Sequence, residues 1–545
     1  MGNDLILFNG NIHTMDQRAL MVSAVAVRDG RIAFAGSEEG ARAALAERRG
    51  APALDLGGRC VVPGLTDAHL HFRWYAESLR AVDVETPSLA ESLVRVGERA
   101  GRGEPGEWIT GTGWNHNVWE GGAFPTRAHL DRISPRNPVA LKAKSGHAMW
   151  VNSLALAQAG ITGTVPDPDG GRIVRGGDGD PTGILLENAM DLVQAVIPKP
   201  APHELAGMMR DAQEAAHRAG LTGIHDFDGA LAFQAFRLLE ERGELSLRVE
   251  KGIPHELLSE AIRLGLRTGF GGELLRLGAV KMFADGALGS LTAWMLSPYE
   301  GTRNTGIATL AEETLRDDVY RANAAGLACA IHAIGDAACR AVLDAFARAG
   351  AETLETAETA GTVGTGGTAG PRLRNRIEHA QLLHPDDLAR LARLGVVASM
   401  QPIHATSDMH IAERHWGPRC AGAYAWNSLL AAGTTLAFGS DCPVETLDPL
   451  AGIHAASTRR RADGSPGPKG WRPAQRIGVE QAVAAYTLGA AFAAGREGDL
   501  GALAPGKLAD LTVLGSDIFS IDPHAIRETK AEATIVGGRI VYRAF

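Results

Sequence analysis

Cysteine is scarce, and the number and spacing of the cysteines argue against two kinds of stabilising site. The 545 residues include five, namely Cys60, Cys329, Cys339, Cys420 and Cys442. An odd number with no Cys-x-x-Cys pair implies neither a disulfide framework nor a zinc site built from thiolate pairs. Free thiols suit a reducing compartment, and we therefore expect a cytoplasmic protein.

Aromatic residues, excess charge and long apolar runs are scarce as well. Aromatic residues make up 5% and the formal net charge is -9, a mild acidity that argues against a nucleic acid or an anionic membrane as partner. No uncharged apolar stretch approaches the roughly 20 residues that a membrane span needs. The N-terminus lacks the basic and apolar regions of a signal peptide. The chain is otherwise 45% hydrophobic and 21% charged, which is ordinary for a globular enzyme.

Short β-like runs occupy both ends of the chain. Between residues 4 and 61 they alternate with turns, and Asp29-Gly30 between two such runs is a strong hairpin signal. Residues 508–542 repeat the pattern. Because each end is too short to bury a core alone, we predict that the two ends pair into one small sheet domain.

The region between the ends alternates short apolar runs with longer helical stretches, which predicts repeated βα units and a parallel sheet. Eight candidate strands indicate an α/β fold with a closed (β/α)8 TIM barrel. The number of strands depends on treating about residues 100–200 as an insertion, and residues 351–371 are a low-complexity surface insertion. The candidate strands are Val61–His71, Leu221–Phe227, Ser246–Gly252, Gly278–Phe283, Leu327–Ala333, Arg376–Gln381, Val396–Gln401 and Thr435–Ser440.

Residues that bind metals stand where several of these strands end. His69 and His71 point to the same face of the first strand, and neutral imidazoles bind zinc and similar ions. Two ordinary surface histidines would be the usual interpretation, but barrel enzymes place their sites at such strand ends. Lys281 lies inside an apolar run, where a lysine must snorkel, pair or be modified. Further candidates at strand ends are His332, His379 and Asp441.

This ordered set and the motifs around it resemble the metal-dependent amidohydrolase superfamily, in the amidohydrolase-family-3 branch that includes N-substituted formamide deformylase. The resemblance implies a barrel over residues 62–494 and a flanking β-sandwich formed by residues 1–61 and 495–545. The matching segments are 62–71, 145–147, 281–289, 332–336, 378–381, 400–402, 439–441 and 498–510.

The resemblance also implies roles for individual residues. Lys281, carboxylated by carbon dioxide, would bridge two divalent metal ions of the Zn²⁺ class as a carbamate. Asp441 would bind one ion, orient a metal-activated hydroxide and pass its proton to the leaving amine. If Lys281 stays an amine, the site holds one ion and the lysine is a structural cation. The full expected ligand set is His69, His71, Lys281, His332, His379 and Asp441.

The predicted reaction is hydrolysis of a non-peptide C–N bond in an N-substituted amide or formamide, a small-molecule substrate. Cyclic-amide, carbamate or lactone hydrolysis and deamination on the same scaffold remain alternatives, and a non-catalytic binding protein is a third. A homodimer is a hypothesis that no residue pattern tests. The Trp-containing insertion favours an apolar or aromatic substrate group.

Four residues are candidates for substrate contact, namely Trp114, His147, His225 and Gln401, with His404 a further residue at the rim. Two of them have an equally good structural interpretation. Trp114 would then pack inside the insertion, and His225 would hydrogen-bond to a neighbour of the metal ligands.

Overall fold

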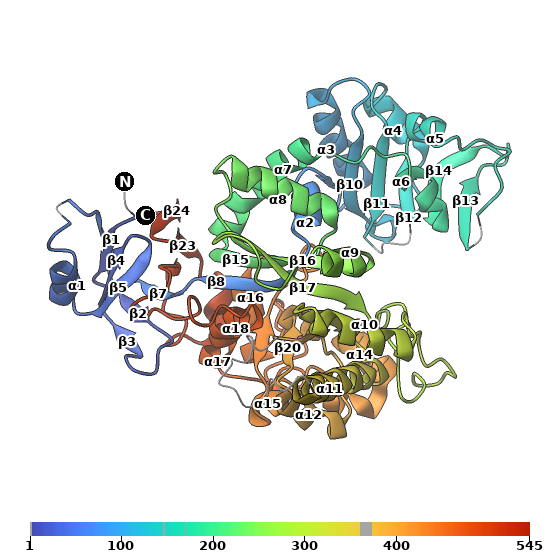
Figure 1. The fold of residues 1–545 in the computed structure, drawn as a ribbon. Coiled ribbons are helices and arrows are strands. Elements are labelled where there is room, and N and C mark those ends of the chain that lie inside the picture. Colours follow the sequence, from blue (N-terminus) through green and yellow to red (C-terminus); the bar gives the residue numbers. More distant parts are fainter. Residues whose placement is uncertain (1–2, 49, 145–147, 169, 360–372) are drawn as a thin grey trace. The chain divides into compact units, whose positions relative to one another are not determined.

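The computed structural model describes residues 3–48, 50–144, 148–168, 170–359 and 373–545. The chain divides into two compact units (Figure 1). The first joins Met1–Tyr75 to Ala206–Phe545, and the second is Ala76–Leu205. The second unit thus contains the insertion that the sequence predicts at about residues 100–200. None of the helices in the described ranges is long and apolar enough to cross a membrane.

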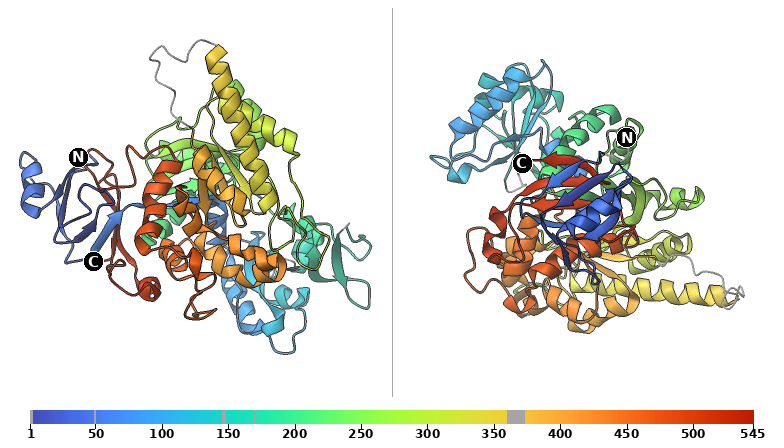
Figure 2. Two further views of the ribbon diagram at one scale, coloured as in Figure 1. Left: turned by 90° about the horizontal axis from the view of Figure 1, so that it is seen from below. Right: turned by 90° about the vertical axis from the view of Figure 1, so that its left-hand side faces the viewer.

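The first unit contains the predicted barrel. One eight-stranded sheet has the order β21-β20-β19-β18-β17-β16-β15-β8, and its neighbouring strands pair in parallel. Helices such as α8 (Ala230–Glu241), α10 (Glu312–Ala324) and α11 (Asp336–Thr359) connect the strands and lie around them (Figure 2), as parallel pairing requires. The strands are β8 (Leu65–Leu70), β15 (Leu221–Asp226), β16 (Arg248–Pro254), β17 (Leu275–Phe283), β18 (Cys329–Ala333), β19 (Arg376–His379), β20 (Val397–Met400) and β21 (Leu436–Phe438).

The first predicted strand is in fact two strands. β7 (Cys60–Pro63) belongs to a sheet at the chain ends, whereas β8 belongs to the barrel. Gly64 separates them, and a Cβ atom there would lie 2.2 Å from the Thr222 hydroxyl oxygen. The chain therefore changes sheet at a position that only glycine can occupy without displacing its neighbours.

The residues just after β21 close the barrel against β8, at the opposite end of the sheet. The Asp67 carboxylate accepts hydrogen bonds from the Ser440 amide, at 3.0 Å, and from the Ser440 hydroxyl. The Asp441 amide donates to the His69 carbonyl at 2.7 Å. Barrel closure thus brings Asp441 beside His69, although 372 residues separate them (441 − 69).

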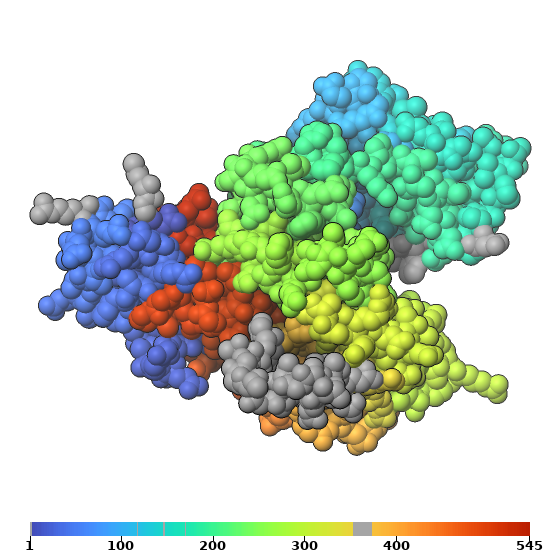
Figure 3. All heavy atoms as spheres, viewed as in Figure 1, coloured from blue at the N-terminus to red at the C-terminus, as the bar shows by residue number. Residues whose placement is uncertain are grey.

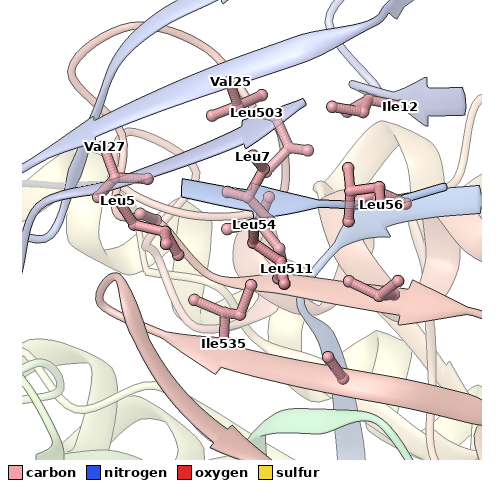
Figure 4. Packing of buried hydrophobic residues seen from close by; sticks show 14 of the residues in the cluster. Leu5, Leu7, Ile12, Val25, Val27, Leu54, Leu56, Leu503, Leu511 and Ile535 are labelled. Atoms are coloured by element: carbon pink, nitrogen blue, oxygen red, sulfur yellow. The ribbon is translucent and has the colours of Figure 1, made fainter. Parts of the chain in front are cut away.

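Two sheets from the chain ends lie side by side in the first unit, as the blue and red segments show (Figures 2 and 3). Their buried side chains form one cluster (Figure 4) that includes Leu5 and Val27 of one sheet and Leu511 and Ile535 of the other. One sheet contains β5 (Arg31–Gly36), β4 (Ala24–Arg28), β1 (Leu5–Phe8) and β6 (Ala53–Asp55). The other contains β24 (Arg539–Arg543), β23 (Ala531–Val536), β22 (Leu511–Leu514), β7, β2 (Asn11–His13) and β3 (Met21–Val22).

The hairpin predicted at Asp29-Gly30 joins β4 to β5, with φ values of 51° and 79° at these two residues. Both sheets belong to the same compact unit as the barrel. A separate sandwich domain with limits at residues 61 and 495 therefore stays a prediction.

The second unit has its own six-stranded sheet and its own core. Trp114 lies in this core with 1% of its surface exposed, and its indole N–H donates to the Leu141 carbonyl at 2.8 Å. Trp114 therefore packs inside the insertion, which is the structural interpretation that the sequence offers. These contacts do not support a role of Trp114 in binding substrate. The sheet consists of β9 (Val82–Asp83), β10 (Ile109–Trp114), β11 (Val139–Ala143), β12 (Ala148–Val151), β13 (Gly171–Arg175) and β14 (Pro181–Glu187). The helices of this unit include α3 (Leu89–Arg102), α4 (Arg127–Ile133) and α5 (Ser153–Gln158).

Candidate metal centre

His69, His71 and Asp441 form the first group of potential ligands. Their ligand atoms all lie within 4.8 Å of one another. The Oδ1 atom of Asp441 is 3.5 Å from His69 Nε2 and 3.4 Å from His71 Nε2. Two ligand atoms at about 2.0 Å from a tetrahedral zinc ion would be about 3.3 Å apart. The three side chains are therefore spaced as ligands of one ion.

A second group, His379, His404 and Asp441, shares the same carboxylate. Its ligand atoms also lie within 4.8 Å of one another, and Asp441 Oδ2 is 3.7 Å from His404 Nε2. His404 lies on α13 (Pro402–Ser407), directly after β20. The sequence predicts His404 only at the rim, outside the expected ligand set. A helix that begins at the strand end turns its imidazole into the centre.

Two imidazole nitrogens in these groups are buried without a hydrogen bond. Among the described residues, His69 Nε2 and His404 Nε2 have no hydrogen-bond partner. A buried nitrogen without a partner costs about 1–3 kcal/mol, and a metal ion would satisfy both atoms. Burial also lowers the pKa of His69 to about 4, which keeps its imidazole in the neutral form that binds metals. The residues present therefore fit a divalent cation.

Carboxyl and amide groups hold three of the imidazoles by their other nitrogen. His69 Nδ1–H donates to Glu378, His71 Nδ1 is 3.2 Å from Asp228, and His379 Nδ1 is 2.8 Å from Gln401 Oε1. A hydrogen bond at Nδ1 leaves the Nε2 lone pair free to bind an ion. Gln401, predicted to contact substrate, instead engages His379 through its oxygen, and only its amide nitrogen remains available.

Glu378 is itself fixed by Arg376, two residues earlier on β19. Arg376 Nε donates to Glu378, and a second guanidinium nitrogen lies 3.1 Å from the same carboxylate. Burial raises the pKa of Glu378, but Arg376 and His69 hold it well below its usual range. A third guanidinium nitrogen is 2.8 Å from His225 Nδ1. His225 therefore touches Arg376 inside the barrel, the structural interpretation that the sequence allowed. The alternation Arg376-Ile377-Glu378 places the two charged side chains on one face of the strand, and this pattern could have identified Glu378 as the partner of Arg376.

Opposing effects set the pKa values of Asp441 and His71, which lie in the middle of the centre. Burial raises the pKa of Asp441, but the hydrogen bond from His71 and the nearby imidazoles hold it well below its usual range. Burial lowers the pKa of His71, yet Asp228 and Asp441 raise it to about 9. A cation at this position therefore competes with a proton on His71.

Lys281 is buried beside the same histidines. Its Nζ atom lies 4.9 Å from the ring centres of Phe227 and Phe283, and its charge contributes to lowering the pKa of His69 and His332. Burial lowers the pKa of Lys281 itself to about 8. In the described part of the chain, no carboxylate lies within ion-pair distance of Nζ.

His332 lies close by but its Nε2 atom points elsewhere. Its ring centre is 4.5 Å from that of His379, whereas Nε2 is 2.9 Å from the Gly286 carbonyl and 3.5 Å from Asp285. His332 is in none of the three ligand groups found among the described residues. His147, the remaining predicted substrate contact, lies outside the described residues, as does most of 351–371.

A family model supports this assignment independently of the geometry. The amidohydrolase family model matches residues 53–542. The chain belongs to the amidohydrolase family. It is accordingly a hydrolytic enzyme that acts on C–N bonds, with the candidate metal centre at the ends of its barrel strands.

Three relatives of this amidohydrolase match it over nearly their whole length. YtcJ of Bacillus subtilis (strain 168) is 33% identical over 98% of this chain and 99% of its own. N-substituted formamide deformylase of Arthrobacter pascens is 30% identical over 99% and 98%. The crystal structure of an uncharacterized metal-dependent hydrolase from Pyrococcus furiosus matches with a TM-score of 0.78 and 30% identity over 95% of this chain and 100% of that one.

Proposed function

We propose that this amidohydrolase cleaves the C–N bond of an N-substituted amide or formamide at a centre of one or two divalent ions. The observation that carries the proposal is that two pairs of histidines share the Asp441 carboxylate. One pair is His69 and His71, and the other is His379 and His404. The relative named N-substituted formamide deformylase, 30% identical over 99% of this chain, supports the substrate class.

The residues divide the chemical work between binding and proton transfer. Imidazoles with a carboxylate suit zinc, and such an ion would supply a Lewis acid and a water of lowered pKa. Asp441 is ionised at neutral pH because the surrounding imidazoles hold its pKa low. Its carboxylate can therefore accept a proton from the attacking water and return it to the leaving amine nitrogen.

We further propose that Lys281 carries a carbamate. The neutral amine would attack carbon dioxide, forming an N–C bond and releasing one proton. Burial lowers the pKa of Lys281 to about 8, although Glu378, Asp441 and the two aromatic rings favour the charged form. A neutral amine that can react with carbon dioxide is therefore accessible near neutral pH. The resulting anion would offer two oxygens where the amine offers one nitrogen. A carbon-13 signal from labelled bicarbonate that disappears in Lys281→Arg would support this assignment.

Exposed aromatic side chains border the centre and support an apolar substituent on the substrate. Trp74 is 50% exposed and stacks on His71 at 4.7 Å. Phe283 is 47% exposed and lies 5.2 Å from the ring of His332. An apolar group placed over these rings would bury surface that now faces solvent. These residues replace Trp114 as the reason to expect an apolar or aromatic group.

A substrate panel tests the proposed function. The purified enzyme, supplied with zinc, manganese or cobalt, would be given N-benzylformamide, N-methylformamide, N-acyl amines, cyclic amides and carbamates, and release of the amine would be measured. We expect hydrolysis of an N-substituted amide and its loss in Asp441→Asn. Failure to hydrolyse any amide with all three metals would contradict the proposal, and ammonia release from a ring amine would indicate a deaminase instead.

A further inference from the structure

A second set of metal-binding side chains lies in the sheets at the chain ends, away from the barrel strands. It consists of His13, Cys60 and Asp517, whose ligand atoms all lie within 4.8 Å of one another. The set contains one imidazole, one thiol and one carboxylate. A single cysteine was no reason to expect a metal site from the sequence, because the neighbours that complete the set are far away in the chain.

The sheet brings the three residues together from three segments. β2 and β7 run in parallel, with Asn11 opposite Cys60. β22 is antiparallel to β7, with Leu514 opposite Cys60, so the chain after β22 returns past the ends of both strands. This loop is anchored where the Phe519 amide donates to Asp517 Oδ1 at 3.1 Å. The Phe519 ring stacks on His13 with 4.0 Å between ring centres, and these contacts hold the imidazole and the carboxylate in place.

One atom of this set lacks a partner. His13 Nε2 is buried and has no hydrogen-bond partner in the described part of the chain. It lies 3.4 Å from Asp517 Oδ1, the same separation as between His71 and Asp441 in the barrel. Cys60 is fully buried, and its sulfur lies within 4.8 Å of the ligand atoms of His13 and Asp517. A thiol–carboxylate pair explains Cys60 and Asp517 but leaves the imidazole nitrogen unsatisfied, whereas a cation satisfies all three.

We propose that His13, Cys60 and Asp517 bind a divalent cation of the zinc class. Binding would form a metal–sulfur bond and release the Cys60 thiol proton to solvent. A thiolate, a carboxylate and a neutral imidazole balance the charge of a dication, and this mixture of nitrogen, sulfur and oxygen ligands is one that zinc accepts.

The position of the three residues indicates what the ion would do. The side chains of His13 and Asp517 are 19% and 24% exposed, so water can occupy a fourth position. The ion would link the first sixty residues to the last thirty, and would stabilise the terminal sheets rather than take part in hydrolysis. The ion and the thiol proton would compete for Cys60, because the thiol must lose its proton to bind.

Cobalt substitution tests this site without depending on activity. The ligands proposed for the barrel centre are nitrogen and oxygen atoms, so a sulfur-to-cobalt charge-transfer band in the wild-type protein reports on Cys60. We expect this band in the wild type and in Cys420→Ser, a buried cysteine outside any ligand group of the described residues. We expect it to be absent in Cys60→Ser.

Zinc content gives a second measurement. We expect Cys60→Ser and His13→Gln to hold one zinc equivalent fewer than the wild type. Absence of the charge-transfer band in the wild type, or its persistence in Cys60→Ser, would overturn the proposal. If Cys60→Ser fails to fold, retention of the full zinc content by folded His13→Gln would overturn the proposal in the same way. Asp517→Asn provides a further variant, in which we expect the same loss of one zinc equivalent.

Discussion

Replacing Glu378 with glutamine would test whether the group behind His69 sets the metal affinity. Glu378 is fully buried and accepts hydrogen bonds from His69 and Arg376. Glutamine has the same shape, but it carries no charge and can no longer pair with the guanidinium. Removing such a supporting group typically costs 10–100-fold in metal affinity. A loss of that size corresponds to about 1.4–2.7 kcal/mol of binding free energy.

The substitution also has a cost in folding that must be separated from the cost in binding. A buried charge left without its partner destabilises a protein by about 3–5 kcal/mol, although Arg376 keeps a hydrogen bond to the Ser399 hydroxyl at 2.6 Å. Urea unfolding monitored by circular dichroism would give the change in the free energy of unfolding. Zinc titration against a chromophoric chelator, on folded protein only, would give the binding term.

Glu250→Gln is the matched control. Glu250 is also a buried carboxylate inside the barrel, on β16, but neither of its oxygens has a hydrogen-bond partner among the described residues. We expect its zinc affinity to equal that of the wild type. If Glu378→Gln binds zinc as tightly as the wild type, or if both variants lose affinity equally, Glu378 does not direct His69 for metal binding.

Three further predictions concern the centre and its surroundings. His404→Ala should weaken zinc binding about 10-fold or more. His410 is an exposed histidine on α14 (Met409–Trp416), and His410→Ala should leave zinc binding unchanged. Equal affinities of the two variants would remove His404 from the ligand set. As the pH falls below about 9, zinc affinity should decrease about tenfold per pH unit, because the ion must displace the proton that Asp228 and Asp441 hold on His71. An affinity that stays constant between pH 6 and pH 8 would refute this. Trp74→Ala should raise KM for an N-benzyl amide several-fold while leaving that for an N-methyl amide nearly unchanged, as steady-state kinetics would show; equal changes for both substrates would argue against an apolar subsite.

The sequence by itself determined the features that depend on local periodicity. Alternation within a strand places His69 and His71 on one face, and repeated apolar runs indicate the eight barrel strands. Asp-Gly between two such runs indicates the first hairpin. These features could be predicted because each depends on the preferences of a few consecutive residues.

Only the tertiary structure decided which side chains meet. Strand periodicity fixes the face of a residue but not its neighbour across the barrel, so the pairing of His69 with Glu378, 309 positions apart, follows only from the order in which the strands close. Local backbone conformation adds a second uncertainty, because His379 and Asp441 have φ values of 72° and 60°, which strand patterns do not predict.

The positions of His404 and His332 depend on these long-range contacts in the same way. A helix start turns His404 into the ligand cluster, and a carbonyl from another loop occupies His332 Nε2. Residue types near strand ends therefore indicate that a metal site exists, but barrel closure and side-chain packing decide its members, because those interactions join residues that no local pattern connects.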